Sequence, residues 1–409
     1  MPMADSAESD AFFASAEEPE SVASARLRLA EFVETHRSLR IACVTSGGTT
    51  VPLERHTVRF IDNFSTGGRG AASAEKLLEG GYAVIFIHRK TSLYPFSRKL
   101  PRGPKLLDAL SGSAAAEVTA AEVRSLQAAA ADAYSAHARR LLAIGFESVH
   151  EYLFLLREAA LALHPIGTSA MLYLAAAVSD FYIPSAALPE HKIQSAGSDT
   201  AGSTTAGSTT AGGLSLTLHG VPKLLGEVKR LWAPRAFLVS FKLETNPAIL
   251  KAKAKTSSHT LTHLAHICHT LPCFPFYPIL PHSTCTGSLF LNSTLTTLKA
   301  ANAISRYGVD VVVANLLESY KRRAMLVSAK GGEAPPLLKV RGDEITEIHV
   351  EGVSCVEIAL RDRDPGDPTF EDPTGEATPA DTTAASAYRA AAELEDELIA
   401  QLVRLHDAC

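Results

Sequence analysis

The stretch that decides the fold is VTSGGTTVPLERHTVRFIDNFSTGGRG, residues 44–70. It continues a mainly apolar run at 39–44, which predicts a buried strand. Residues 46–49 (SGGT) end that strand, and a second glycine cluster at 67–70 (GGRG) opens an alanine-rich helix. Glycines after a strand let backbone N–H groups approach an anion closely, and a helix N-terminus adds positive potential. The stretch therefore predicts a nucleotide- or phosphate-binding site.

Polar side chains between the two glycine clusters are of types that carry out chemistry on a bound ligand; they are Arg59, Asp62, Asn63 and Ser65. The glycines by themselves also fit ordinary turns and helix caps. The stretch has neither the lysine of a GxxxxGK[ST] loop nor a GxGxxG directly after the strand. Spacing alone favours phosphate binding over turns and caps, and leaves both interpretations open.

The segments after the second glycine cluster indicate the fold class. Residues 71–81 (AASAEKLLEGG) contain helix formers and end on two glycines, which stop helices, and residues 82–87 have the apolar content of a strand. This order of strand, loop, helix and strand begins a doubly wound sheet. We therefore predict an α/β fold: a Rossmann-like, doubly wound, mostly parallel sheet with helices on both faces. A helix over 21–38 should lead into the first strand.

Later apolar runs predict further strands of this sheet, at 171–178, 236–241 and 309–314. Such runs are typical of parallel strands buried on both faces, although buried helices look similar. Polar residues follow the runs: Ser179, Asp180, Lys242, Glu244 and Asn315. Because ligands gather outside the carboxyl ends of strands in open α/β sheets, these residues indicate one shared site. A small antiparallel addition is expected from 337–340 and 345–350.

Composition restricts the classes of function. The 409 residues are 46% hydrophobic and 20% charged, which suits a globular enzyme with a sizeable core. A formal net charge of -5 without a concentrated Lys/Arg stripe argues against nucleic-acid binding, and no apolar run reaches membrane-spanning length. Six scattered cysteines without CxxC pairs favour the reducing cytoplasm. The acidic N-terminus does not resemble a targeting signal, so residues 1–20 are expected to be a disordered lead-in.

Segments of unusual composition suggest the domain boundaries. We expect a lead-in and N-terminal helix over 1–38 and a single domain over 39–362. Residues 196–213 repeat small polar residues that bury too little apolar surface to be ordered, and are predicted as a flexible inserted loop. The Pro-, Asp- and Thr-rich residues 363–386 are predicted as a disordered linker to a final helix at 387–409.

Residues 255–300 form a further unusual segment, with no acidic residue, five histidines and three cysteines. Without it, the flanking sequences would join into one helix-to-strand unit, so we hypothesise a lineage-specific insertion or a translated retained intron. Zinc binding is the alternative, since His263, His266, Cys268, His269 and Cys273 lie close together. They lack the regularly spaced ligand pairs of zinc sites, and we predict no metal ligands in the chain.

Five further blocks follow the first stretch in order: AAAVSDFYIP at 175–184, PEHKIQS at 189–195, VPKLL at 221–225, SFKLETNPAIL at 240–250 and VVVANLLES at 311–319. With residues 44–70, they resemble the eukaryotic phosphopantothenoylcysteine synthetase family. Because six blocks agree in order, this resemblance is far more specific than either glycine cluster.

The resemblance implies a ligase that joins 4'-phosphopantothenate to L-cysteine in coenzyme A biosynthesis. It implies a two-step route: a nucleoside triphosphate activates the carboxylate as an acyl-nucleotide, and the amine of cysteine then displaces AMP. The SFKLET form implies ATP rather than CTP, with Mg²⁺ held chiefly by the triphosphate oxygens. A homodimer is also implied, because an arginine of the family reaches the substrate of the neighbouring subunit.

The resemblance also assigns roles to single residues. Asn63 matches a position that binds substrate and stabilises the intermediate, Lys192 one that contacts triphosphate, and Arg59 the arginine that crosses the dimer interface. With Asp180, these make up the predicted catalytic set. Substrate binding is expected at Arg59, Asn63, Ala176, Ala177 and Asp180. Nucleotide binding is expected at Gly47, Ser65, Gly67, Gly70, Lys192, Lys223, Phe241 and Asn315.

These residues also have ordinary structural interpretations. An asparagine in DNFS and an aspartate after a strand commonly cap helices and turns. A phenylalanine that ends a strand is commonly core, and a lone lysine or arginine is commonly a solvated surface charge. Only the resemblance favours the functional interpretation over these alternatives.

Rival classes of function make different predictions. A dinucleotide-dependent oxidoreductase should have an acidic residue after its second strand, where this chain has HRK at 88–90, which disfavours NAD but not NADP. A non-catalytic relative should have lost the matched site residues. A fused flavin-dependent decarboxylase is not expected, because only about 38 residues precede the first strand.

Overall fold

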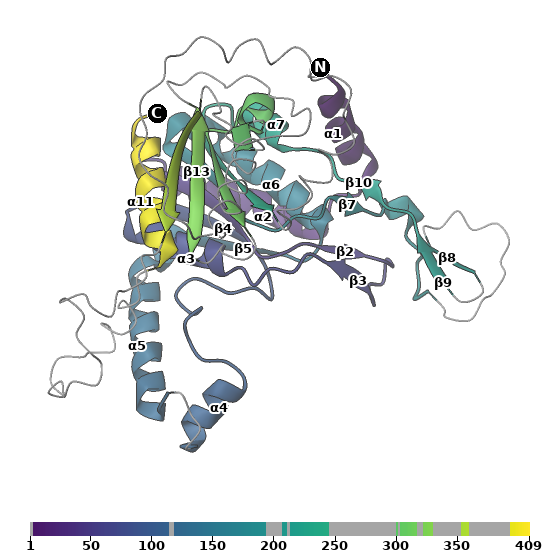
Figure 1. The fold of residues 1–409 in the computed structure, drawn as a ribbon. Coiled ribbons are helices and arrows are strands. Elements are labelled where there is room, and N and C mark those ends of the chain that lie inside the picture. The colour runs from purple at the N-terminus through teal and green to yellow at the C-terminus, as the bar shows by residue number, and fades with distance from the viewer. Residues whose placement is uncertain are drawn as a thin grey trace, which may run out of the picture. The chain divides into compact units, whose positions relative to one another are not determined.

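The computed structural model describes residues 3–113, 118–193, 207–210, 213–244, 300–301, 303–316, 322–329, 353–359 and 393–409. These residues have an α/β fold whose main sheet contains eight strands and is mostly parallel, as predicted (Figure 1). The chain divides into two compact units. The first is Met1–Val239 with Leu360–Cys409, and the second is Ser240–Ala359. The single domain predicted over 39–362 includes parts of both.

Parallel strands form the core of the first unit, in the spatial order β6-β1-β4-β5. They are β1 (Ile41–Ser46), β4 (Ala83–Arg89), β5 (Leu141–Phe146) and β6 (Ala170–Leu174). Ile41 pairs with Ala83 on one side and with Ala170 on the other. Every residue of β1 is buried, as expected for a central parallel strand. Because the strands are parallel, their carboxyl ends meet at one edge, to which β1 contributes Ser46.

The first unit also contains the helices α2 (Glu20–Thr35), α3 (Gly68–Glu79), α4 (Pro104–Ser111), α5 (Ala120–His137), α6 (Val149–Leu163) and α11 (Leu394–Asp407). α2 packs against α6, and α3 packs against β1 and β4. Capping boxes begin three of them: Thr119 with Glu122 at α5, Ser148 with Glu151 at α6, and Glu393 with Asp396 at α11. Shorter helical segments are η1 (Ala138–Arg140), η2 (His164–Ser169), η3 (Ser185–Ala187), α7 (Leu225–Glu227) and the π-helix η4 (Val228–Trp232).

The final helix, α11, packs against α3. His406 is 2% exposed and joins two other parts of the unit. Its Nε2 lies 2.7 Å from the Thr168 carbonyl oxygen and its Nδ1 lies 2.9 Å from the Tyr82 hydroxyl. A carbonyl only accepts, so Nε2 carries the proton and Nδ1 accepts from Tyr82. Asp396 of α11 also pairs with Lys76 of α3 at 2.9 Å.

The N-terminal helix α1 (Met3–Ser15) corrects the prediction of a disordered lead-in. Phe12 is 3% exposed, and its ring centre lies 5.3 Å from that of Tyr182. The Arg157 guanidinium lies 4.2 Å from the centre of the Phe13 ring. Two adjacent aromatic side chains thus bury enough surface to order a segment whose composition is otherwise acidic and alanine-rich.

We expect Phe12→Ala to lower the free energy of unfolding by about 3 kcal/mol, because it removes a buried ring and leaves a cavity. Leu27→Ala is a matched control on α2, since Leu27 is 74% exposed and its loss should cost within about 0.5 kcal/mol. Urea unfolding followed by circular dichroism measures both. Equal values for the two variants would show that Phe12 does not pack.

Short antiparallel ribbons extend the first unit. β2 (Thr50–Pro52) pairs with β3 (Phe60–Asp62), β7 (Phe181–Tyr182) with β10 (His219–Gly220), and β8 (Gly207–Thr210) with β9 (Gly213–Leu216). The last ribbon differs from the flexible loop predicted over 196–213. Thr209 pairs with Leu214 there, and threonine favours strands more than its small polar neighbours do.

The second unit contains an antiparallel part. β11 (Phe237–Glu244) runs across the boundary between the units, and β12 (Val311–Leu316), β13 (Arg323–Ala329) and β14 (Val353–Ala359) follow. β13 is antiparallel to both β12 and β14. An antiparallel addition therefore exists, built from residues other than those predicted. The predicted pair at 337–340 and 345–350 lies outside the described residues, as do 255–299 and 363–386.

Boundaries of the predicted elements agree with the structure to within a few residues. The apolar runs at 82–87, 171–178, 236–241 and 309–314 correspond to β4, β6, β11 and β12. The helix predicted over 21–38 is α2, and the final helix is described from Leu394 onward. Among the described helices, none is long and apolar enough to cross a bilayer.

Candidate nucleotide and substrate site

The carboxyl end of β1 and the N-terminus of α3 lie in contact because glycines leave room between them. A Cβ on Gly70 would lie 2.4 Å from Ser46 Oγ, and one on Gly67 would lie 2.9 Å from the same atom. Gly67 also has a φ of +76°, which glycine adopts without strain. Ser46 Oγ donates to the Gly67 carbonyl at 3.0 Å. The N-cap residue Gly67 has no side chain, and Thr66 Oγ1 accepts from the Gly68 N–H at 3.4 Å; the positive potential of this helix N-terminus suits an anion.

Gly47 and Gly48 join this edge to the AAAVSD segment. The Ala177 N–H donates to the Gly47 carbonyl at 2.8 Å, and the Thr49 N–H donates to the Ala177 carbonyl at 3.0 Å. A Cβ on Gly48 would lie only 1.6 Å from the Asn63 carbonyl oxygen. The Asn63 N–H donates to the Thr49 carbonyl at 3.1 Å. The structure therefore brings the predicted residues Gly47, Asn63 and Ala177 together.

Local hydrogen bonds fix the loop that carries Asn63. Asp62 accepts from Arg89 Nη1 at 2.5 Å, and Ser65 Oγ accepts from the Gly67 N–H at 3.3 Å. Ser65, which was predicted to bind nucleotide, thus forms part of a turn. Asn63 is half-buried beside them, and Ala176 is half-buried with its N–H donating to Thr45 Oγ1 at 3.2 Å.

Two residues predicted for different ligands form an ion pair. Lys223 Nζ lies 2.9 Å from Asp180 Oδ1, with side chains 55% and 75% exposed. The Val221 N–H donates to the Asp180 carbonyl at 2.9 Å and holds the two segments side by side. Exposed pairs contribute little to stability, so folding alone does not demand these charges.

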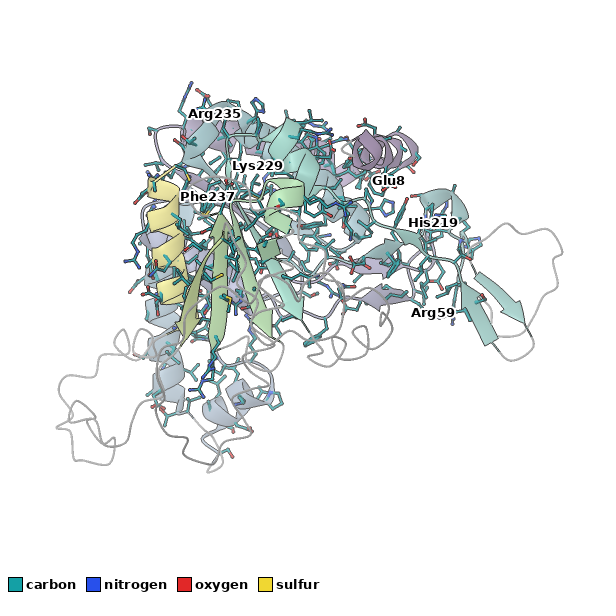
Figure 2. The ribbon with its side chains drawn as sticks, turned by 45° about the horizontal axis from the view of Figure 1, so that its top comes forward. Glu8, Arg59, His219, Lys229, Arg235 and Phe237 are labelled. Atoms are coloured by element: carbon teal, nitrogen blue, oxygen red, sulfur yellow. The ribbon has the colours of Figure 1, made fainter. Side chains whose placement is uncertain are left out.

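Arg59 is bound within its own chain. Its Nη1 and Nη2 both donate to the Ile193 carbonyl at 3.1 Å, and Nη1 also lies 3.4 Å from Glu54 Oε1. Figure 2 shows Arg59 beside the β2–β3 ribbon. The exposed Lys192 directly precedes Ile193, so Arg59 and Lys192 belong to neighbouring segments. Sequence reasoning missed Glu54, although an acidic residue five positions before Arg59 was a usable signal.

Electrostatics at the edge bear on the rival chemistries. Burial lowers the pKa of His88, so its imidazole is neutral at pH 7. Burial raises the pKa of Cys43 to about 12, so this thiol does not act as a nucleophile. Arg89 belongs to the HRK sequence that is compatible with NADP binding. Its guanidinium is paired with Asp62, so the ribose phosphate of NADP would have to compete with that carboxylate.

The second unit carries the remaining predicted residues, Phe241 and Asn315. Phe241 is half-buried on β11, and Asn315 is 7% exposed on β12. Asn315 Oδ1 is buried and has no hydrogen-bond partner among the described residues. Because buried acceptors are normally paired, this atom fits a ligand N–H such as the amino group of a nucleobase. Within the described ranges, no three His, Cys, Asp or Glu side chains are arranged to hold a metal ion.

Comparisons with known proteins agree with this geometry. The family model of the DNA/pantothenate metabolism flavoprotein C-terminal domain matches residues 38–140. The human phosphopantothenate–cysteine ligase is 45% identical over 237 residues, which are 55% of this chain and 70% of the human protein. Phosphopantothenate–cysteine ligase 1 of Oryza sativa subsp. japonica is 35% identical over 353 residues, 83% of this chain and 90% of the rice protein.

A solved structure is similar over nearly the whole length. It is a Cab2 mutant in complex with phosphopantothenate-cysteine, with a TM-score of 0.65 and 27% identity. The match covers 98% of this chain and 97% of the Cab2 chain. Sequence identity, coverage and fold thus agree, and the chain belongs to the phosphopantothenate–cysteine ligase family.

Proposed function

We propose that this chain joins 4'-phosphopantothenate to L-cysteine with ATP, through an acyl-adenylate, in the reducing cytoplasm that the cysteine spacing predicts. Membership of the family makes it a phosphopantothenate–cysteine ligase of coenzyme A biosynthesis that uses a nucleoside triphosphate. The finer parts of the proposal are the nucleotide, the intermediate and the residue roles. One observation carries it: Gly47, Asn63 and Ala177 meet at the edge where α3 begins.

Two bond exchanges make up the reaction. A carboxylate oxygen of 4'-phosphopantothenate attacks the α-phosphorus of ATP, and the bond to pyrophosphate breaks. The amine of cysteine then attacks the acyl carbon, loses a proton and displaces AMP. The protein has to hold two anions together and stabilise negative charge on the acyl oxygen, which positioning and preorganised donors achieve.

The geometry supports a role for each group. The Asn63 side-chain amide can donate to the carboxylate and to the oxyanion that develops from it. The glycine-rich N-terminus of α3 suits the phosphates of the nucleotide. Lys192 and Lys223 supply positive charge for the triphosphate, and Asp180 with Ala176 and Ala177 binds substrate.

The nucleotide part of the proposal rests on two features. A Cβ at Gly67 or Gly70 would fill the space at the start of α3 where phosphates are proposed to lie. Asn315 Oδ1 offers a buried acceptor to an exocyclic amino group, which adenine and cytosine both possess. The SFKLET block favours ATP between them. Mg²⁺ is expected on the triphosphate oxygens, where it neutralises charge.

Exposed apolar side chains support a homodimer. Val58, Phe60 and Phe64 on and around the β2–β3 ribbon are 57%, 49% and 86% exposed. Clustered exposed hydrophobic residues commonly mark protein interfaces. Arg59 lies within this stretch, as required of a residue that reaches a partner subunit. Sedimentation velocity should give a dimer, and a fully active monomer would contradict this part of the proposal.

Pyrophosphate release tests the function directly. The purified chain is given 4'-phosphopantothenate with ATP or CTP, with and without cysteine. We expect sustained turnover with ATP and cysteine, and slower turnover with CTP. If neither nucleotide is consumed, the assay is repeated on a variant that lacks residues 255–300. Inactivity of both proteins would overturn the proposal.

A further inference from the structure

Glu54 is the most deeply buried acidic side chain near the candidate site, with no exposed surface. It lies between β2 and β3, in the turn that leads to Arg59. Burying a carboxylate costs desolvation free energy unless hydrogen-bond donors surround it. The donors around Glu54 therefore indicate its role.

The partners of Glu54 come from two segments that are far apart in the sequence. Its Oε2 accepts from the N–H groups of Val58 and Arg59, at 3.4 and 3.0 Å. Its Oε1 accepts from Arg59 Nη1 and from the Ile193 N–H, both at 3.4 Å. One carboxylate therefore fixes the backbone and the guanidinium of Arg59, and also reaches the residue after Lys192.

Both backbone groups of Ile193 are thus bound by the same ion pair. Glu54 accepts from its N–H, while the two terminal nitrogens of Arg59 donate to its carbonyl. Upstream, the same segment is held by other contacts: the Arg55 N–H donates to the Pro189 carbonyl at 2.9 Å, and the His56 and His191 rings stack with their centres 5.8 Å apart. The Glu54–Arg59 pair holds the segment at Ile193, the residue that follows Lys192.

We propose that Glu54 is a positioning residue for ligation: it places Arg59 directly and Lys192 through the backbone of Ile193. This inference rests on the roles proposed above for Arg59 and Lys192. Its consequence is that one carboxylate supports both the arginine that reaches the neighbouring subunit and the segment that carries the triphosphate-binding lysine. A displacement of about 1 Å in a positioned group can cost about 100-fold in rate.

Glu54→Gln is the informative substitution because it keeps the volume and removes the charge. The carboxamide turns N–H donors toward groups that are themselves donors, so the bond from Ile193 or from Arg59 is lost. The backbone bond to Pro189 remains, and we expect the protein to fold. Glu190→Gln is the matched control: it makes the same charge change between the same two segments, at a side chain that is 57% exposed.

Two readouts in the full-length protein test the proposal. Hydrogen exchange of peptides that end at residue 193 should be about tenfold faster in Glu54→Gln, which corresponds to one lost hydrogen bond. In pyrophosphate release, kcat should fall on the order of 100-fold while KM for cysteine stays within about twofold. Glu190→Gln should match the wild type in both.

Outcomes separate this inference from the function on which it rests. A wild-type protein without turnover would overturn both. If the wild type turns over normally, the role of Glu54 alone is overturned when folded Glu54→Gln shows unchanged hydrogen exchange or an unchanged kcat. The same conclusion follows if Glu190→Gln has effects equal to those of Glu54→Gln. If Glu54→Gln does not fold, Glu54→Asp keeps the charge and withdraws it by one methylene from Ile193. Wild-type exchange and kcat in Glu54→Asp would then reject the proposal.

Discussion

Asn63→Ala is expected to lower kcat for pyrophosphate release by about 100- to 1,000-fold, the usual cost of removing one donor to a developing oxyanion. Stability should hardly change. The loop is fixed by backbone groups of Asn63, whose N–H binds the Thr49 carbonyl and whose carbonyl lies against Gly48, and alanine keeps both. Steady-state turnover and urea unfolding measure the two effects separately.

Asn63→Asp completes this test because it keeps the size of the side chain and replaces the amide donor with a negative charge. It should be at least as inactive as alanine, since the carboxylate repels the substrate carboxylate and triphosphate. Full activity in either variant would remove Asn63 from the mechanism. A loss of activity that parallels a loss of stability would assign it the turn-forming role instead.

Gly48→Ala is expected to destabilise the protein by more than about 3 kcal/mol, because overpacking forces backbone shifts where no flexible side chain can yield. The new Cβ would lie 1.6 Å from the Asn63 carbonyl oxygen and 2.8 Å from its carbonyl carbon. The loop would therefore have to move away from β1, and turnover should fall together with the denaturation midpoint.

Gly220→Ala is the matched control for this substitution. A Cβ there meets nothing within 4 Å, so stability should stay within about 0.5 kcal/mol of the wild type. Urea midpoints of both variants, measured with turnover at the same temperature, decide the question. A Gly48→Ala protein as stable as the control would show that the loop does not lie over Gly48.

Local patterns in the sequence predicted the elements that carry the candidate site, namely β1, the glycine loops and α3. The order of strand, glycine loop and helix at 39–81 can be predicted from neighbouring residues alone, because each element depends on its own hydrophobic periodicity and capping residues. The small side chains of Ala176 and Ala177 likewise lie where their segment approaches the backbone of Gly47 and Thr49. The proposed roles of single residues came from the family blocks, because spacing does not assign them.

Contacts between distant segments could not be predicted in this way. Glu54 and Ile193 come into contact only once the fold has formed, and no sequence pattern around either residue predicts this contact. Phe12 was overlooked for the same reason, since an aromatic pair in a polar segment orders it only if α6 offers a partner. The division into two units also depends on long-range packing rather than on composition.

The helix that ends the chain completes the unit that the first strand begins, and this has a consequence for biosynthesis. The ribosome makes α3 roughly 300 residues before α11. At about 5–20 residues per second, the nascent chain spends on the order of 15–60 s with the α11-binding surface of α3 uncovered. During that interval the buried contact between Tyr82 and His406 cannot form. The uncovered face of α3 is then open to chaperones.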